Sequence, residues 1–224
     1  MGVEKEGYYR RGDVAGSYDL LRFRSAAGKL THLRELGVLK ASFRPAERLL
    51  ELGCGTARLL KALNGDGFEV IGLDQSEAML RAGGLEPGPR ALVGDVRNIP
   101  LPDGSVDGAY TFRMTNHLPD LRPFLGECFR VLRPGGRLVF DTMRWSILRA
   151  DWARWGGKNH PVSDRTARAW LERTGFLVES VEPLFPVGPY LIAGMPERLA
   201  RWLLKPGMVL GSAHAIAVWT ARKP

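Results

Sequence analysis

The sequence predicts an α/β protein whose mostly parallel sheet is doubly wound, with helices on both faces. Short apolar runs of strand length alternate along the chain with segments in which apolar residues recur at helical spacing. This alternation favours a parallel sheet, because each strand needs a crossover to reach its parallel neighbour. Three of the first four apolar runs end in an acidic residue or lead directly into one. Since open α/β sheets bind ligands at the carboxyl ends of their strands, these acids predict a ligand site along that edge.

The first two thirds of the chain contain five of these apolar runs. The expected strands cover residues 48–52, 68–73, 90–93, 106–112 and 137–141. Helices are expected over residues 57–63, after Ser76, which suits an N-cap, and over residues 121–132. A turn at residues 134–136 ends the last of these helices. Residues 1–46 are polar and basic with apolar residues at helical spacing, so we expect a loop followed by one or two helices.

Two further strands are expected in the last third of the chain. They cover residues 176–184 and 215–221, and helices are expected over 151–155 and 163–174. The link over residues 184–212 is long and apolar, and an amphipathic helix that carries Trp202 and basic side chains is expected to begin at Pro196. Such a segment would cover an apolar substrate or touch a membrane or lipid. Alternatively it would pack on the domain's own sheet or form a dimer contact, which leaves the oligomeric state open.

Composition and cysteine content limit the class of protein. The chain of 224 residues has 45% hydrophobic and 25% charged residues, as soluble globular proteins do. The sequence has no apolar run long enough for a membrane-spanning helix, and its first residues lack the apolar stretch of a secretory signal. Two cysteines, Cys54 and Cys128, are too few for a disulfide framework or a Cys-rich metal site. We therefore expect a cytoplasmic protein without a bound metal.

The net charge of +8 raises the question of a nucleic-acid partner. Arginine binds phosphate well, so a basic protein is a candidate for binding RNA or DNA. The arginines are, however, scattered along the whole chain, and no basic run of the kind that marks a nucleic-acid tail is present in the sequence. Genomic base composition explains the high arginine content more simply, so a nucleic-acid partner is not expected.

The glycine turn after the first strand carries the most chemical information. Gly53 and Gly55 let the chain turn tightly and let a ligand lie against bare backbone. A dinucleotide-binding turn has a third glycine where this chain has Arg58. Glu51, directly before the turn, would also repel a phosphate. The turn therefore favours a small ligand that donates hydrogen bonds or carries positive charge.

Four ordered segments carry a resemblance to a known family. They are Leu50-Glu-Leu-Gly-Cys-Gly-Thr56, Gly72-Leu-Asp-Gln-Ser76, Val93-Gly-Asp-Val96 and Val131-Leu-Arg-Pro-Gly-Gly-Arg-Leu-Val139. From about residue 48 to residue 142 the chain resembles the class I S-adenosylmethionine-dependent methyltransferases. The resemblance implies a Rossmann-like sheet of seven strands with the last one antiparallel, S-adenosylmethionine as methyl donor and S-adenosylhomocysteine as product. Ala57 departs from the pattern, because the family usually has a third glycine there.

The resemblance also implies a set of cofactor-binding residues at the strand ends. They are Glu51, Gly53, Cys54, Gly55, Thr56, Asp74, Gln75, Met79, Gly94, Asp95, Val96 and Phe112. Within this set, Asp74 would accept both ribose hydroxyls, Asp95 would accept from the adenine amino group, and Glu51 would help to hold the ammonium group of the methionine moiety. Taken singly, three of these residues have a structural alternative. Asp74 would be an acid at a turn or helix start, Met79 an ordinary core residue, and Asp95 part of a simple loop.

The methyl acceptor is less defined by the sequence. Residues 111–117 follow the fourth strand, where the resemblance implies acceptor-facing groups, but they lack the Asn/Asp-Pro-Pro-Tyr/Phe segment of enzymes that methylate adenine or glutamine. His117 is the candidate general base, because its ordinary pKa lies near neutrality. Alternatively, His117 caps a helix that begins near Pro119 or lines the cofactor pocket.

The N-terminal segment resembles the lid of the small-molecule methyltransferases related to those of ubiquinone and menaquinone biosynthesis. Tyr18 and Asp19 correspond to their Tyr-Asp pair, so Tyr18 would close over the methionine end of the cofactor or, alternatively, anchor a helix. We thus expect a lid over residues 1–46 and a methyltransferase domain over 47–224, with a substrate-covering insertion at about 184–212. The expected function is direct transfer of a methyl group to a small apolar or aromatic molecule. An RNA-modifying enzyme and a non-catalytic S-adenosylmethionine-binding protein are the alternatives.

Overall fold

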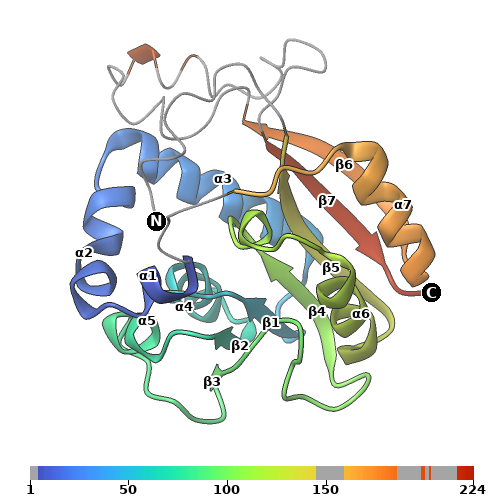
Figure 1. Ribbon diagram of the computed structural model, residues 1–224, viewed down its shortest axis with the longest axis horizontal. Coiled ribbons are helices and arrows are strands. Elements are labelled where there is room, and N and C mark those ends of the chain that lie inside the picture. Colours follow the sequence, from blue (N-terminus) through green and yellow to red (C-terminus); the bar gives the residue numbers. More distant parts are fainter. Residues whose placement is uncertain (1–4, 145–158, 186–197, 200–201, 203–215) are drawn as a thin grey trace.

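One sheet of seven strands forms the centre of the computed structural model (Figure 1). The structure describes residues 5–144, 159–185, 198–199, 202 and 216–224. The strands are β1 (Arg48–Leu52), β2 (Glu69–Asp74), β3 (Ala91–Val93), β4 (Val106–Thr111), β5 (Leu132–Met143), β6 (Leu177–Phe185) and β7 (Ile216–Arg222), in the order β3-β2-β1-β4-β5-β7-β6. The pairs among β1 to β5 are parallel, whereas β7 is antiparallel to both β5 and β6. This topology confirms the predicted fold class.

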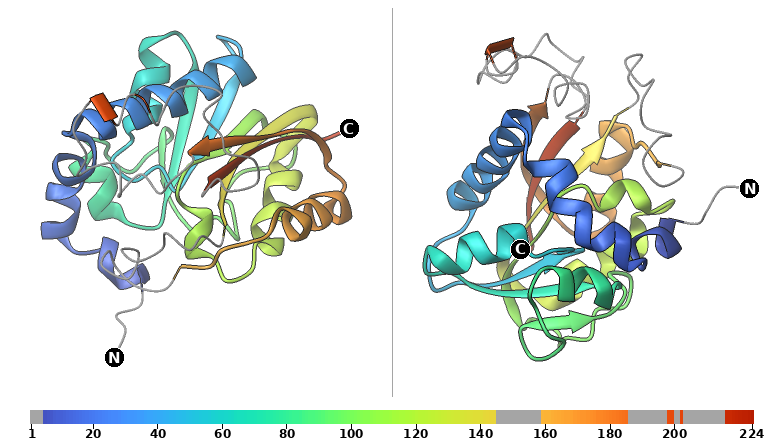
Figure 2. Two further views of the ribbon diagram at one scale, coloured as in Figure 1. Left: turned by 90° about the horizontal axis from the view of Figure 1, so that it is seen from above. Right: turned by 90° about the vertical axis from the view of Figure 1, so that its left-hand side faces the viewer.

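Helices connect the strands and cover both faces of the sheet (Figure 2). They are α1 (Lys5–Tyr9), α2 (Gly12–Phe23), α3 (Ala26–Ser42), α4 (Arg58–Gly65), α5 (Glu77–Ala82), the 3-10 helix η1 (Thr115–His117), α6 (Arg122–Val131) and α7 (Asp164–Thr174). Ser76 and Ser163 cap α5 and α7 with their side chains, each accepting a hydrogen bond from a backbone N–H in the first turn.

From Lys5 onward, three helices precede β1, whereas the sequence predicted one or two. The break between α2 and α3 is a tight corner at which the Ser25 side chain accepts a 3.1 Å hydrogen bond from the backbone N–H of Gly28. A Cβ atom on Gly28 would lie 2.4 Å from the carbonyl oxygen of Arg22. Glycine is therefore what lets the two helices meet so closely, and helical periodicity alone does not reveal this corner.

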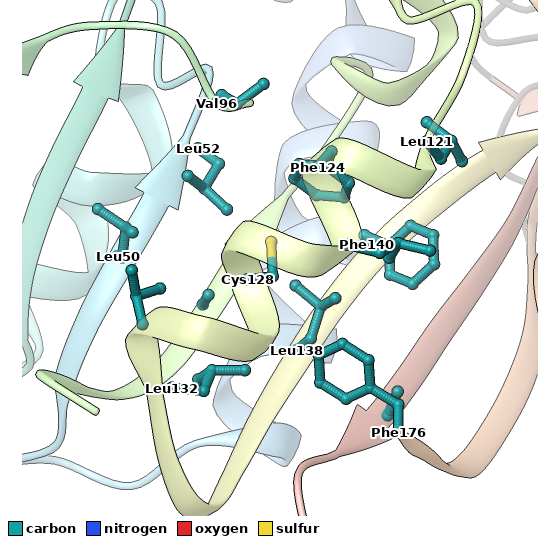
Figure 3. Close-up of a cluster of buried hydrophobic side chains, with 14 of the residues drawn as sticks. Leu50, Leu52, Val96, Leu121, Phe124, Cys128, Leu132, Leu138, Phe140 and Phe176 are labelled. Carbon is teal, nitrogen blue, oxygen red and sulfur yellow. The ribbon is translucent and has the colours of Figure 1, made fainter. Parts of the chain in front are cut away.

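Alternate residues of the strands enter two separate cores, as the period of a strand requires. Leu49 of β1 and Tyr110 of β4 pack with residues of α3 and α4 on one face. Leu50 and Ala109, one position away, pack on the other face with α6 and α7. Figure 3 shows this second core, in which Phe124 of α6 lies over the sheet. Burial on both faces explains why the central strands are almost continuously apolar.

Residues 134–136 lie within β5 and do not separate it from α6. Val106 pairs with Leu132 and Gly108 with Arg137, so the register shifts and extra residues of β5 bulge out between these two pairs. Gly135 takes a φ of +81° in this bulge. The predicted turn is therefore an irregularity inside a longer strand, whose pairing resumes at Arg137.

Part of the C-terminal third lies outside the described residues. This applies to the helix predicted over 151–155 and to most of the insertion predicted at 184–212. Of the predicted amphipathic helix, Arg198, Leu199 and Trp202 are described, and the side chains of all three are exposed. None of the helices in the described part of the chain has the length and apolar character needed to span a membrane.

Candidate functional site

A cavity lies at the carboxyl ends of the parallel strands, where the sequence predicts a ligand site. Most of the residues that the resemblance implies line it: Tyr18, Gly53, Gly55, Asp74, Gln75, Met79, Gly94, Asp95, Val96, Phe112 and His117. Other lining residues were not singled out, although the first three lie in segments that were expected at the site: Tyr9, Arg113, Met114, Arg97 and Leu118. The cavity therefore joins the ends of β1 to β4 with side chains from the N-terminal helices.

The loop after β1 needs glycine at two positions. Gly53 has a φ of +67° and Gly55 a φ of +54°, a region that L side chains rarely adopt. A Cβ atom on Gly53 would also lie 2.6 Å from Cγ of Met114. Ala57, where the family usually has another glycine, takes the same left-handed region with a φ of 57°. The loop thus presents bare backbone to the cavity.

Asp74, at the end of β2, ties this loop to the start of α5. One carboxylate oxygen accepts a 2.7 Å hydrogen bond from the backbone N–H of Gly55, and the other accepts a 2.8 Å bond from the backbone N–H of Ser76. Burial raises the pKa of Asp74, and these two hydrogen bonds counteract part of that increase. Each oxygen retains a further lone pair with which it can accept a ligand hydroxyl.

Glu51 lies beneath the loop and does not line the cavity. Its Oε2 atom accepts a hydrogen bond of 2.9 Å from the backbone N–H of Leu60 and one of 3.2 Å from the hydroxyl of Tyr110. Burial raises the pKa of Glu51 to about 7, although the charge of Arg58 opposes the change. Glu51 therefore fastens α4 to β1, and its contact with a ligand ammonium group stays a prediction.

Cys54 and Thr56 also direct their side chains away from the cavity. Cys54 is buried against Gly72, and burial raises the pKa of its thiol well above the ordinary value, so it is not poised as a nucleophile. The Thr56 hydroxyl donates a 2.7 Å hydrogen bond to the carboxylate of Asp19 in α2. This bond joins the glycine loop to the N-terminal helices.

At the far end of the cavity, Asp95 is paired with Arg97. The two side chains are 2.7 Å apart, and this hydrogen-bonded partner lowers the pKa of Asp95. Met79 and Val96 provide apolar walls on the same side. An amino group that approached Asp95 would share the carboxylate with Arg97.

Two side chains of α6, Glu127 and Arg130, hold the segment from Ile99 to Leu101 that follows Asp95. Neither was predicted as a site residue. Arg130 donates to the carbonyl oxygens of Leu101 at 2.7 Å and Ile99 at 2.8 Å, and it also pairs with Glu127 at 2.8 Å. Glu127 in turn accepts a 2.7 Å hydrogen bond from the backbone N–H of Ile99. The i, i+3 spacing of Glu127 and Arg130 can be seen in the sequence. Their backbone partners in the segment after Asp95 cannot.

Aromatic side chains close the cavity near the glycine loop. The ring of Tyr9 contacts His117 edge to face at 5.5 Å between centroids and Tyr18 at 6.1 Å. The Ser76 hydroxyl donates a 2.7 Å hydrogen bond to the carbonyl oxygen of Tyr9, which fixes α1 over the site. His117 ends η1 and lines the cavity, and α6 begins later, at Arg122, so the alternative in which His117 caps that helix is wrong.

A buried group of charges lies behind the loop and reaches the cavity through Arg113. Arg58 forms an ion pair with Glu35, and its guanidinium stacks 4.0 Å from the ring centroid of Phe23. Arg113 stacks at 4.7 Å from the same ring centroid and lies 3.6 Å from Glu35. His32 contacts Arg58 as well, and burial lowers the pKa of His32. These residues hold α2 and α3 against the edge of the sheet at which the parallel strands end.

Comparison with known proteins agrees with this architecture. Residues 50–140 match the family model described as a methyltransferase domain. A malonyl-[acyl-carrier protein] O-methyltransferase of Pectobacterium atrosepticum is 31% identical over 206 residues, which are 86% of this chain and 78% of that protein. The chain belongs to the S-adenosylmethionine-dependent methyltransferases. This relationship, together with Arg58 in place of the last glycine of a dinucleotide-binding turn, favours a methyltransferase over the dinucleotide-binding alternative.

Other relatives of this chain show the same relationship over part of their length. A demethylmenaquinone methyltransferase of Beutenbergia cavernae is 36% identical over 143 residues, 62% of this chain and 59% of that protein. The chain spans between 34% and 59% of the length of several curated relatives that it matches. The crystal structure of a methyltransferase from Thermotoga maritima, a possible histamine N-methyltransferase, has 22% identity and a TM-score of 0.71, covering 97% of this chain and 100% of that chain. That similarity supports the fold.

Proposed function

We propose that this protein transfers the methyl group of S-adenosylmethionine to a small molecule with an apolar or aromatic body. The observation that carries the proposal is the single cavity that joins Asp74 and the glycine loop to the aromatic side chains of Tyr9, Tyr18 and His117. One end of this cavity suits a nucleoside and the other suits a flat or apolar molecule. A methyltransferase needs both ligands in one water-excluding space.

The residues present fit the cofactor. Two glycines at positive φ leave backbone that a Cβ atom would obstruct, which suits the methionine moiety. Asp74 retains lone pairs for the ribose hydroxyls, and Met79 and Val96 flank the space for adenine. Bound there, S-adenosylmethionine supplies an activated methyl group. The protein's own contribution is to align the acceptor, exclude water and accept a proton where the acceptor loses one.

The nature of the walls supports a small acceptor. Phe112 and Met114 add apolar surface to the aromatic side chains around the glycine loop. Relatives of this chain include enzymes named for demethylmenaquinone and for 24-methylenesterol, whose bodies are apolar. Several arginines of the described surface are paired with acids: Arg11, Arg81, Arg97, Arg122 and Arg130. This pairing favours the small molecule over RNA.

His117 is placed to act as the general base in this proposal. It lines the cavity beside Phe112 and Tyr9, and the ordinary pKa of histidine is near neutrality. Residues 1–46 act as the lid, supported by the hydrogen bond between Thr56 and Asp19 and by the lining positions of Tyr9 and Tyr18. The insertion at about 184–212 completes the cover, and the exposed apolar side chains of Leu199 and Trp202 support that role.

Binding and turnover together test the proposed function. Calorimetry should detect S-adenosylhomocysteine binding to the wild-type protein, and labelled S-adenosylmethionine should transfer its methyl group to quinone or phenol acceptors and not to bulk RNA. His117→Ala should lower turnover at least about tenfold while affinity for S-adenosylhomocysteine stays nearly constant. Absence of S-adenosylhomocysteine binding would overturn the proposal, and unchanged turnover of the His117 variant would remove its role as a base.

A further inference from the structure

Arg113 has an unusual backbone at the edge of the cavity. It follows β4 with a φ of +63°, a region that costs a non-glycine residue free energy. Its backbone N–H donates a 2.8 Å hydrogen bond to the buried carboxylate of Asp141 in β5, which holds it in this conformation. Such strained residues concentrate at functional sites, where the surrounding structure enforces them.

The strained conformation presents an incompletely paired guanidinium. One fifth of the side chain is accessible (20%), and Arg113 is among the lining residues of the cavity. Its Nε atom lies 3.6 Å from Glu35, too far for a hydrogen bond, and it has no hydrogen-bond partner within the part of the chain that the structure describes. The ring of Phe23 covers one face of the guanidinium at 4.7 Å. The guanidinium thus keeps hydrogen-bonding capacity that no described residue satisfies.

Arg113 shares its nearest acidic neighbour with a second guanidinium. Glu35 is shared with Arg58, which pairs with it more closely. The Asp141 carboxylate is engaged by the Arg113 backbone, and burial raises the pKa of Asp141 to about 7, so it carries only part of a negative charge near neutral pH. Two guanidinium groups therefore depend on Glu35 and on two carboxyls, Glu51 and Asp141, whose pKa values burial raises to about 7. A ligand carboxylate would add an acceptor for the Arg113 guanidinium, whose Nε atom lacks a hydrogen-bond partner among the described residues.

We propose that Arg113 is a receptor for a carboxylate group at the glycine-loop end of the cavity. A guanidinium binds a carboxylate through two parallel hydrogen bonds, and the stacked ring of Phe23 fixes the plane in which it does so. The carboxylate belongs either to the methyl acceptor, which then combines an apolar body with an acidic group, or to the methionine moiety of the cofactor. The inference rests on the proposed function, because both ligands occupy this cavity in that function.

Two binding measurements on Arg113→Gln distinguish the sources. Calorimetry compares S-adenosylhomocysteine with 5′-methylthioadenosine, which lacks the amino-acid part. If the cofactor carboxylate binds Arg113, the variant loses at least about tenfold in affinity for S-adenosylhomocysteine and keeps its affinity for 5′-methylthioadenosine. Benzoate and benzamide are then titrated into protein saturated with S-adenosylhomocysteine. If the acceptor carboxylate binds Arg113, the wild-type protein prefers benzoate at least about threefold and the variant loses that preference.

Controls keep the test decisive if the glutamine variant folds poorly. Arg113→Lys keeps the charge without the planar fork, so it should retain the fold and part of the carboxylate affinity. Arg165→Gln removes the same charge from the exposed surface of α7 and should change none of these affinities. Unchanged affinities in both Arg113 variants, together with no benzoate preference in the wild-type protein, overturn the proposal. If the wild-type protein does not bind S-adenosylhomocysteine at all, the proposed function fails first.

Discussion

The carboxylate of Asp74 accepts a 2.7 Å hydrogen bond from the backbone N–H of Gly55. This contact joins the end of β2 to the glycine loop after β1, so that the two form one continuous surface. Gly55 belongs to the turn after β1, and Asp74 ends the neighbouring strand β2. A ligand that rests on the glycine backbone therefore also meets the carboxylate. Asp74 thus has a structural role beside the ligand-binding role that we propose for it, and a substitution there must be examined for both.

Replacement of Asp74 should weaken cofactor binding. In Asp74→Ala the ribose loses a charged acceptor and the glycine loop loses its anchor, so affinity for S-adenosylhomocysteine should fall at least about tenfold by calorimetry. Asp66→Ala, an exposed acid whose surface ion pair with Lys40 is weak, should leave the affinity unchanged. Equal affinities of the Asp74 variant and the wild-type protein would contradict the assignment of Asp74 to the ribose.

The sequence predicted the sheet well because its strands are local, apolar and bounded by turn residues. β1 has the predicted bounds, Arg48–Leu52, and the predicted cap of α5 is made by Ser76. The cavity could also be predicted, because acids at neighbouring strand ends converge in any parallel sheet. Asp74 and Asp95 were found on that ground, together with the resemblance.

What the sequence did not reveal depends on contacts between distant segments. Nothing in the residues around Tyr9 shows that its carbonyl oxygen will meet the hydroxyl of Ser76. The positive φ of Arg113 follows from its hydrogen bond to Asp141, which belongs to another strand. The side chain of Glu51 was expected at the ligand, but burial between β1 and α4 gives it structural partners. Such partners depend on how distant segments pack together, and a local sequence pattern does not contain that information.

The contact between α6 and the segment after Asp95 gives a second prediction. Arg130→Met removes the hydrogen bonds to the carbonyl oxygens of Ile99 and Leu101, so that segment should loosen. We expect a loss of roughly 1–3 kcal/mol in the free energy of unfolding and an affinity for S-adenosylhomocysteine that falls about threefold or more. Urea unfolding and calorimetry measure the two effects.

A matched control for this prediction lies on the same helix. Arg122 begins α6 and pairs with its neighbour Asp120, with 67% of its side chain exposed. Arg122→Met should therefore change stability and affinity very little. If Arg130→Met behaved as this control does, the proposed support of the cavity wall by α6 would be wrong.

Lys223, close to the C-terminal end of the chain, should contribute to stability through the end of α6. Its ammonium group donates hydrogen bonds of 2.8 Å to the carbonyl oxygen of Phe129 and 2.7 Å to that of Leu132, where the helix leaves carbonyl groups without partners. Lys223→Met keeps the length and apolar stem but loses the donor. Urea denaturation should show a loss of about 1–3 kcal/mol, whereas Lys61→Met, on an exposed position of α4, should change stability by less than about 0.5 kcal/mol.

The buried carboxyl of Glu51 should make the protein less stable as the pH rises towards neutrality. Burial raises the pKa of Glu51 from 4.5 to about 7, so between these values the folded protein keeps a proton that the unfolded chain has lost. Because the folded state then binds more protons, the free energy of unfolding falls as the pH increases across this range. The difference between the two pKa values corresponds to roughly 3 kcal/mol for this group.

Glu51→Gln isolates this contribution, because an amide oxygen can still accept from the Leu60 N–H and the Tyr110 hydroxyl but does not ionise. The variant and the wild-type protein should have similar stability at about pH 4.5, and the variant should be the more stable one above about pH 7. Burial raises the pKa of Asp141 to about 7 as well, so the variant should retain a shallower decline over the same range. Urea unfolding at a series of pH values measures both slopes. If the stability of the variant and of the wild-type protein declined with the same slope, Glu51 would ionise at its ordinary pKa in the folded protein, and the prediction would be wrong.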